Sequence, residues 1–443
     1  MTRSQRPDRL SRDGLGIPLF HPIVCAASLG DPLEISWTTA ENRVKVPGDP
    51  MRIVQLRLHA VRIPRIYRTH VAASGGPTHG KEGSLYYVLE AVGTGGCVGL
   101  GEISDMEDAW DTPSIEQFSG RLTPLLVGTD PKDRRQLLDR VRDEVTDLHP
   151  ELARMACCCV ETALLDLLAR GAGLPLCDLL GGRCRDRVGV TWVAYIRGVH
   201  DLELEMRTKL DEGFCAFKLK VGSDAALDCE RVALARRLAG PKAHLRLDAS
   251  GSWQTHQEAL EQIRCFAELG ADAVETPLAC VARSIAKDQP ELVNADPVEA
   301  AEALRALRSA APLPLIEHVA DFDDAFTIEL LARHSVDAIN VVPVQAGGLL
   351  RAQRLLQVAE TAGIPALLGG TVELGIGTAA ALHLGVAARS VTWASDLVGP
   401  GLLQGDVIRE GFRYEKGALA LPGGIGLGVD LDAKLLKQFA AQT

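Results

Sequence analysis

The sequence predicts an α/β protein in which an α+β domain precedes a (β/α) barrel. Between Met51 and Gly182, apolar–polar alternation typical of strands is followed by apolar residues at helical spacing. After Gly182 the rhythm changes, and short apolar strands alternate with amphipathic helices. Strands joined by crossover helices form a parallel sheet. Seven or eight such units fit a barrel, whose active site lies at the carboxyl ends of its strands.

The first domain is expected over residues 51–182. Strands are predicted at 51–63, 84–92 and 97–103, with a loop at 71–82, and helices over 113–182. The first fifty residues differ from this pattern. They are rich in Arg, Asp and Pro and have no period of a strand or helix, so we expect 1–50 to be a disordered extension or a misassigned start.

Composition excludes several classes of protein. The 443 residues are 47% apolar and 24% charged, which is ordinary for a globular protein. A net charge of −11 argues against nucleic acid as a partner, since phosphate-backbone binding needs a basic surface. No apolar run is long enough to span a membrane. The 11 cysteines form no CxxC pair, so we expect reduced thiols. The adjacent Cys157, Cys158 and Cys159 are expected to be buried. Reduced thiols are typical of a cytoplasmic protein, which we therefore expect.

Ionisable residues stand at the ends of four successive predicted barrel strands. Lys218 and Lys220 share one face of their strand, Asp248 ends the next strand, and Glu275 and Glu317 end the two that follow. One strand–helix repeat separates each of the first three strands from the next, and an insertion near 280–300 lengthens the last interval. Parallel barrel strands therefore bring all these side chains to one mouth.

This set of residues suits proton abstraction next to a carboxylate. Three converging carboxylates provide oxygen ligands for a hard divalent cation, and we expect Mg²⁺. Two lysines beside them suit a general base, because a neighbouring cation and partial burial lower the pKa of a lysine. The metal would stabilise the enediolate that forms when the proton leaves.

These strand ends resemble the enolase superfamily, and most closely its muconate lactonizing enzyme subgroup, within the mandelate racemase and muconate lactonizing group. The resemblance covers roughly Met51 to Phe439. It is carried by the order of six stretches: VGLGE (98–102), LLGGR (179–183), FKLKVG (217–222), RLDASGSW (246–253), AGGL (346–349) and GGTVELGIGTAAALHLGVA (369–387).

The resemblance implies a fold, a cofactor and partners. It implies a modified (β/α)7β-type TIM barrel at 183–400. A capping domain, formed by 51–182 and completed by 401–443, would lie on this barrel. Cap loops near 66–83 and 103–112 would close over the substrate. The resemblance also implies one Mg²⁺ per active site, a small carboxylate substrate and a homo-oligomer.

It further implies a role for each matching residue. Lys220 resembles the catalytic base and Lys218 its support. Asp248, Glu275 and Glu317 resemble the metal ligands, although the family's Asp-Glu pair is replaced here by Glu317-His318. The side chains expected to contact substrate or to support these groups are Ser250, Trp192, His318 and Glu373, and His318 is also an alternative acid.

One departure bears on the reaction. The family usually has a second lysine on the sixth barrel strand, five residues before Gly-Gly, and Val342 stands there. A racemase or epimerase normally needs acid–base groups on both faces of its substrate, whereas a syn elimination or cycloisomerisation needs one. We therefore expect a lyase, namely a dehydratase of a small hydroxy acid or a hydroxylated amino acid such as cis-3-hydroxyproline. The alternatives are a racemase, epimerase or cycloisomerase of the same superfamily, and a catalytically silent protein of this fold.

Overall fold

The computed structural model describes residues 51–69, 80–108, 110–279, 281, 296–320 and 322–441. The chain divides into two units, Met1–Gly48 and Asp49–Thr443, and every described residue belongs to the second. The expectations for residues 1–50, for most of the loop at 71–82 and for most of the insertion near 280–300 lie outside the described residues.

An antiparallel sheet begins the fold, with its strands in the order β1-β2-β3. The strands are β1 (Ile53–Thr69), β2 (Lys81–Gly93) and β3 (Val98–Met106). β1 and β2 extend beyond the predicted strands because their pairing continues, after a register shift, past Pro64 to Thr69 and Lys81. β1 pairs with β2 alone in this sheet and so forms its edge, where a proline without an N–H is tolerated.

Helices follow this sheet over the predicted range. They are α1 (Ile115–Leu126), α2 (Arg134–Glu144), α3 (Pro150–Ala172) and α4 (Leu176–Leu179). α1 begins with a capping box between Ser114 and Gln117, and α3 ends where Gly173 adopts a left-handed conformation. The three adjacent cysteines are buried on α3, as predicted, and their thiols are free.

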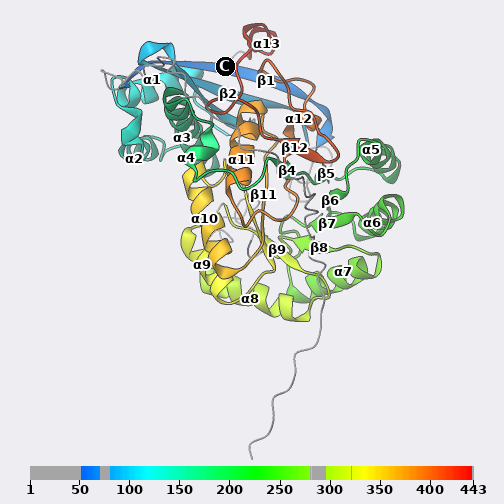
Figure 1. Cartoon of the computed structure of the whole chain (residues 1–443). Helices are drawn as coiled ribbons and strands as arrows, with labels where there is room; N and C mark the ends of the chain where they lie inside the picture. The colour runs from blue at the N-terminus through cyan, green and yellow to red at the C-terminus, as the bar shows by residue number, and fades with distance from the viewer. Residues whose placement is uncertain are drawn as a thin grey trace, which may run out of the picture. The chain divides into compact units, whose positions relative to one another are not determined.

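Seven parallel strands, in the sheet order β11-β10-β9-β8-β7-β6-β5, curl into the barrel (Figure 1). They are β5 (Trp192–Ala194), β6 (Ala216–Lys220), β7 (His244–Asp248), β8 (Ala273–Glu275), β9 (Leu315–His318), β10 (Ala338–Val341) and β11 (Ala366–Leu368). Each is followed by a helix, namely α5 (Val199–Asp211), α6 (Ala225–Ala239), α7 (His256–Glu268), α8 (Pro297–Ala310), α9 (Asp324–Ala332), α10 (Leu349–Ala362) and α11 (Gly375–Ala387).

An extended segment, residues 391–395, joins the two edges of this sheet. Val391 forms a parallel bridge with Ala366 on β11, and Ser395 forms another with Val190, just before β5. The segment thus takes the place of an eighth strand. The predicted fold class, a modified (β/α)7β barrel with an α+β N-terminal cap, is confirmed.

The C-terminal part of the chain returns to the first sheet. The backbone N–H of Arg62 on β1 donates to the carbonyl of Phe439 at 2.9 Å. The elements on this path are β12 (Ala418–Ala420), which pairs with β4 (Arg187–Gly189), and the short helices α12 (Gly399–Leu402) and α13 (Ala433–Gln438). The exact domain boundaries stay a prediction. Among the described residues, no helix has the length and apolar character needed to cross a membrane.

Two contacts fix the first sheet to the barrel. Buried Glu102 on β3 accepts hydrogen bonds at 2.8 Å from the backbone N–H groups of Leu374 and Gly377, where α11 begins. Tyr86 on β2 donates from its hydroxyl to the carbonyl of Val372 at 2.8 Å. Val372 has a φ of 87°, which is strained for a β-branched residue. The cap therefore helps to hold a strained loop of the barrel.

The close approach of β3 to α3 generates a stability prediction. A Cβ atom on Gly101 would lie 2.0 Å from the carbonyl oxygen of Cys159, so Gly101→Ala must push strand and helix apart. We expect a loss of about 1–3 kcal/mol in the free energy of unfolding, measured by urea denaturation. Gly120→Ala, at an exposed position of α1 with open space around it, is the control. It should raise the free energy of unfolding by up to about 1 kcal/mol. Equal effects of the two substitutions would contradict the contact.

Candidate active site at the barrel mouth

The ends of β6, β7 and β8 place four of the predicted residues on one interior face. In the parallel register, Lys220 lies beside Asp248, and Asp248 lies beside Glu275. Lys218, two residues before Lys220, shares its face. These side chains line a pocket of about 190 Å³. The pocket's other lining residues are Ser250, Thr276, Glu317, His318, Phe322, Asn340, Val342, Gln345, Gly369, Gly370, Thr371 and Asp396.

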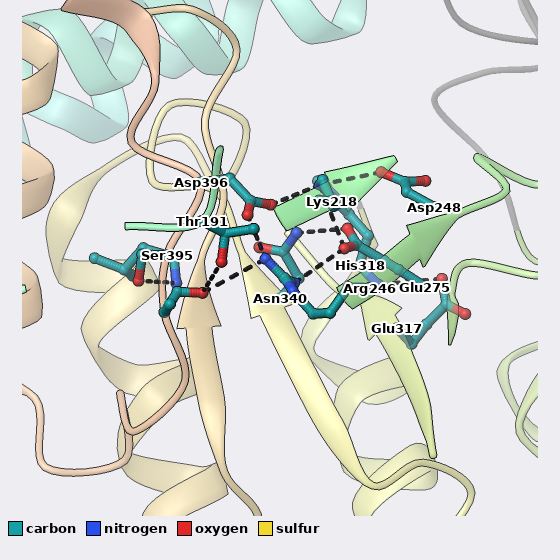
Figure 2. Close-up of polar contacts among 12 residues, drawn as sticks. Thr191, Lys218, Arg246, Asp248, Glu275, Glu317, His318, Asn340, Ser395 and Asp396 are labelled. Atoms are coloured by element: carbon teal, nitrogen blue, oxygen red, sulfur yellow. Dashed lines mark hydrogen bonds and ion pairs between the residues drawn. The ribbon is translucent and has the colours of Figure 1, made fainter. Parts of the chain in front are cut away.

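The ammonium group of Lys218 lies among three carboxylates (Figure 2). Its Nζ is 2.6 Å from Asp396, 3.1 Å from Asp248 and 3.3 Å from Glu275. Burial alone would lower the pKa of Lys218, but these three carboxylates outweigh burial and raise it. The structure therefore differs from the expected lowering of a lysine pKa at this position. Lys218 is a fixed positive charge.

Lys220 is the more exposed of the two lysines that line the pocket. Its Nζ donates to Asp248 at 2.6 Å and to the hydroxyl of Ser250 at 3.3 Å. Its side chain is 16% exposed, against 6% for Lys218. Burial alone would raise the pKa of Asp248, but Lys220 and Lys218 outweigh it and hold that pKa below its usual range.

The structure adds site residues that the sequence reasoning did not select. Asp396 follows the segment that closes the barrel and forms an ion pair with Arg246 as well as with Lys218. Asn340 on β10 donates from its side-chain amide to Glu275 at 2.6 Å. Asp396 could have been found as the acid that ends the eighth repeat, just before Gly-Pro-Gly. Asn340 could have been found two residues before Val342, because alternation puts both on one face.

Glu317 and His318 lie on opposite faces of β9. Ile316 belongs to the small apolar cluster of the barrel interior, with Ala273, Ala338 and Leu367. Alternation then assigns His318 to the interior face and Glu317 to the other, but both side chains line the pocket because they lie at the end of the strand. Glu317 is fully buried, and its Oε2 atom has no hydrogen-bond partner among the described residues. Burial, reinforced by the charge of Glu275, raises its pKa well above the usual range.

The residues present suit a divalent cation by their chemistry, although they are not gathered around one point. Asp248 and Glu275 are buried neighbours with oxygen ligands of the kind that Mg²⁺ prefers. The unpartnered oxygen of buried Glu317 is the sort of atom that a cation would satisfy. Within the described ranges, however, no group of three His, Cys, Asp or Glu residues is placed to hold a metal ion. The role of Glu317 as third ligand stays a prediction.

The remaining predicted site residues divide between the pocket and the core. Ser250 lines the pocket, and its backbone N–H and hydroxyl donate to Asp248 at 2.8 and 2.9 Å. Trp192 is fully buried away from the pocket lining and donates from its indole N–H to Glu205 at 2.9 Å. Glu373 is buried beside the pocket, where it accepts a hydrogen bond from the N–H of Thr371 at 2.8 Å.

The lysines of the pocket all come from one strand. Both of its lysines come from β6, whereas the sixth barrel strand, β10, contributes Asn340 and, just past its end, Val342. Neither of these two side chains can exchange a proton near neutral pH. Lysine side chains therefore enter the pocket from β6, neutral side chains from β10, and the imidazole of His318 from β9.

Comparisons with known proteins agree with this fold. The family model for the mandelate racemase / muconate lactonizing enzyme N-terminal domain matches residues 74–181. The enolase C-terminal domain-like model matches residues 201–289 and 281–435. Together the barrel and its cap define an enzyme-like fold with charged strand ends at one mouth. The chain belongs to the enolase superfamily, in its muconate lactonizing enzyme subgroup.

Similar proteins within this family are isomerases by name. Muconate cycloisomerase 1 of Rhodococcus opacus is 31% identical over 364 residues, which are 79% of this chain and 90% of that protein. L-Ala-D/L-Glu epimerase of Bacillus subtilis is 31% identical over 63% of this chain and 71% of that protein. The structure of 2-chloromuconate cycloisomerase from Rhodococcus opacus 1CP aligns with a TM-score of 0.75 at 25% identity, covering 88% of this chain and all of that one.

Buried Glu373 generates a prediction about pH. Burial raises its pKa from 4.5 to about 7, so folding holds a proton on this group. The stability it contributes is complete below pH 4.5 and is lost as the pH rises through 7, by an amount on the order of 3 kcal/mol. Glu373→Gln should therefore flatten the decline in unfolding free energy between pH 5 and pH 8, measured by urea denaturation. Glu360→Gln, at an exposed position of α10, should show the same pH dependence of unfolding free energy as the wild type. The same pH dependence in all three proteins would contradict the assignment of the raised pKa to Glu373.

Proposed function

We propose that this protein is an isomerase of the cycloisomerase type, acting at the carbon next to a carboxylate with Lys220 as its acid–base group. The observation that carries this proposal is the placement of the lysines, both on β6, with Asn340 and Val342 where the family usually has a second lysine. The cycloisomerase and epimerase relatives favour an isomerase over the expected dehydratase.

The charge of the site supports a carboxylate substrate that arrives with a cation. Three positive side chains, those of Lys218, Lys220 and Arg246, are paired with three carboxylates, those of Asp248, Glu275 and Asp396. The floor of the pocket is therefore close to neutral. An anionic substrate entering it needs additional positive charge to offset its loss of water.

A divalent cation is the group that would supply this charge. We propose that Mg²⁺, which members of this superfamily generally use, is held by Asp248 and Glu275 with Glu317 as third ligand. When bound, it would stabilise negative charge on the substrate carboxylate as that charge develops.

The chain's own residues then account for the proton transfer. Lys220, held by Asp248 and Ser250, donates a proton to the carbon next to the carboxylate when an internal carboxylate adds to the adjacent double bond. In the reverse direction the same amine removes that proton and the ring C–O bond breaks. Lys218 stays charged and keeps Asp248 and Glu275 in place. Both directions use one face of the substrate, so a neutral residue on β10 is sufficient.

The other reaction classes differ in what they demand of the pocket. An epimerase needs a second acid–base group opposite Lys220, and β10 provides none where the family usually has a lysine. A dehydratase would use the same lysine on the same face and expel hydroxide in place of a ring carboxylate. A catalytically silent protein would not need to retain an accessible lysine beside paired carboxylates.

Metal binding is the first test. In magnesium titrations followed by calorimetry, Asp248→Asn and Glu275→Gln should each weaken binding at least tenfold, because each removes a charged oxygen ligand. Glu317→Gln should weaken it to a similar extent, and His318→Ala should leave it within about twofold. The reverse ranking of these last two would assign the third position to His318. Glu261→Gln, on exposed α7, is the control.

Proton NMR in D₂O with Mg²⁺ and unsaturated dicarboxylates of the muconate class tests the reaction. We expect a lactone with one deuterium on the carbon next to the carboxylate, placed on a single face. Lys220→Ala should lower the rate by about 10²–10⁴-fold, the usual contribution of a general acid–base group. Lys242→Ala, at an exposed site, should have no effect.

Two other outcomes of the NMR experiment would overturn the cycloisomerase proposal. Exchange at a stereocentre with inversion, on any dipeptide or N-acylated amino acid, would establish an epimerase and require a second proton donor. Loss of water from a hydroxy acid or a hydroxyproline isomer would establish the dehydratase that the sequence favoured.

A further inference from the structure

A second cavity lies outside the active site, against α2, α3 and the start of α10. Its volume is about 290 Å³, close to the lower end of the range for small-molecule sites. Its lining includes Ala346 and Gly347, and the neighbouring Gln345 lines the active-site pocket. The two cavities therefore share one short loop of the barrel.

Arginines from three helices line this cavity. Arg142 comes from α2, Arg154 from α3, and Arg351 and Arg354 come from α10. The chain as a whole carries a net charge of −11, so four guanidinium groups around one small cavity run against its overall composition. Guanidinium groups offer paired N–H donors that match carboxylate and phosphate oxygens.

These arginines differ in how firmly they are held. Arg351 donates to Asp324 at 2.9 Å and to the carbonyls of Ala320 and Ala346 at 2.9 and 3.1 Å, so its charge is fixed in place. Arg354 is 62% exposed and pairs with Asp324 at 3.9 Å, which is long for an ion pair. Arg142 is 64% exposed and pairs with Asp139, itself 69% exposed. Such exposed pairs contribute little energy and can exchange one anion for another.

The carboxylate that lines the cavity is already engaged. Glu161 on α3 accepts a hydrogen bond at 3.0 Å from the backbone N–H of Leu350, in the first turn of α10. Its carboxylate therefore caps that helix and is buried. The exposed guanidinium groups of the lining are those of Arg142 and Arg354.

The rest of the lining is apolar. Leu138 and Val145 are buried at the α2 side, and Ala346 is buried on the barrel loop. A ligand that fits this cavity thus combines an apolar body with an anionic head group. We propose that the cavity binds a small organic anion, with a carboxylate or phosphate held by Arg142 and Arg354 and its apolar part against Leu138, Val145 and Ala346.

Calorimetric titration of the full-length protein with four probes tests this site. The probes are phenyl phosphate, benzoate, inorganic phosphate and phenol. Phenyl phosphate or benzoate should bind, more weakly as NaCl is raised, and the tighter of the two identifies the head group. Inorganic phosphate, which lacks the apolar body, and phenol, which lacks the charge, should each bind at least tenfold more weakly.

A matched pair of double variants locates the binding. Arg142→Gln with Arg354→Gln removes two exposed arginines of the cavity and should weaken the tighter probe at least tenfold. Arg135→Gln with Arg140→Gln changes the same charge on exposed positions of α2 outside the lining and should leave binding within twofold. Thermal unfolding of both variants checks that each is folded.

Three results would overturn the proposal. The first is equal binding of the probe to both double variants, which would place the probe at the active site. The second is that neither organic anion binds. The third is that inorganic phosphate binds as tightly as phenyl phosphate.

Discussion

The barrel mouth depends on pairing buried charges of opposite sign. Lys218 is the centre of this arrangement, because its ammonium group contacts carboxylates from β7, β8 and the closing segment. Removing any one partner would leave a charge buried without compensation, which typically costs several kcal/mol. The same contacts that make the floor stable also fix the positions of the groups that surround the substrate. A substitution that removes one of these charges is therefore expected both to destabilise the fold and to displace the groups that line the pocket.

Much of the site could be predicted because two simple periods determine it. Alternation along a strand put Lys218 and Lys220 on one face, and the regular strand–helix repeat put Asp248 and Glu275 beside them. The structure brings all four together. Glu317 shows the limit of this approach, since a shift of one residue on β9 moves a side chain to the opposite face. No property of the single sequence decided whether Glu317 or His318 faces the interior.

Other features depend on contacts distant in the sequence. Asp396 joins the site because its segment closes the barrel between Ala366 and Val190, and neither partner is near it in the chain. Trp192 was expected near the substrate because it lies on a barrel strand, but it is the first residue of β5 and its side chain packs against Phe214 and Tyr414. The length of β1 was underestimated because Pro64 reads as a strand end, and only its place at a sheet edge makes it tolerable.

The closing segment has a consequence for how the protein is made. Lys218 and Arg246 are synthesised about 150 residues or more before Asp396, the carboxylate that both of them contact. Until residue 396 has left the ribosome, the nascent barrel holds two cations without this partner and an open edge on β5 and β11. The strands present by then cannot complete the mouth of the barrel. Formation of the charged floor of the pocket is thus delayed until residue 396 has emerged, when the last strand position and the last charge arrive together.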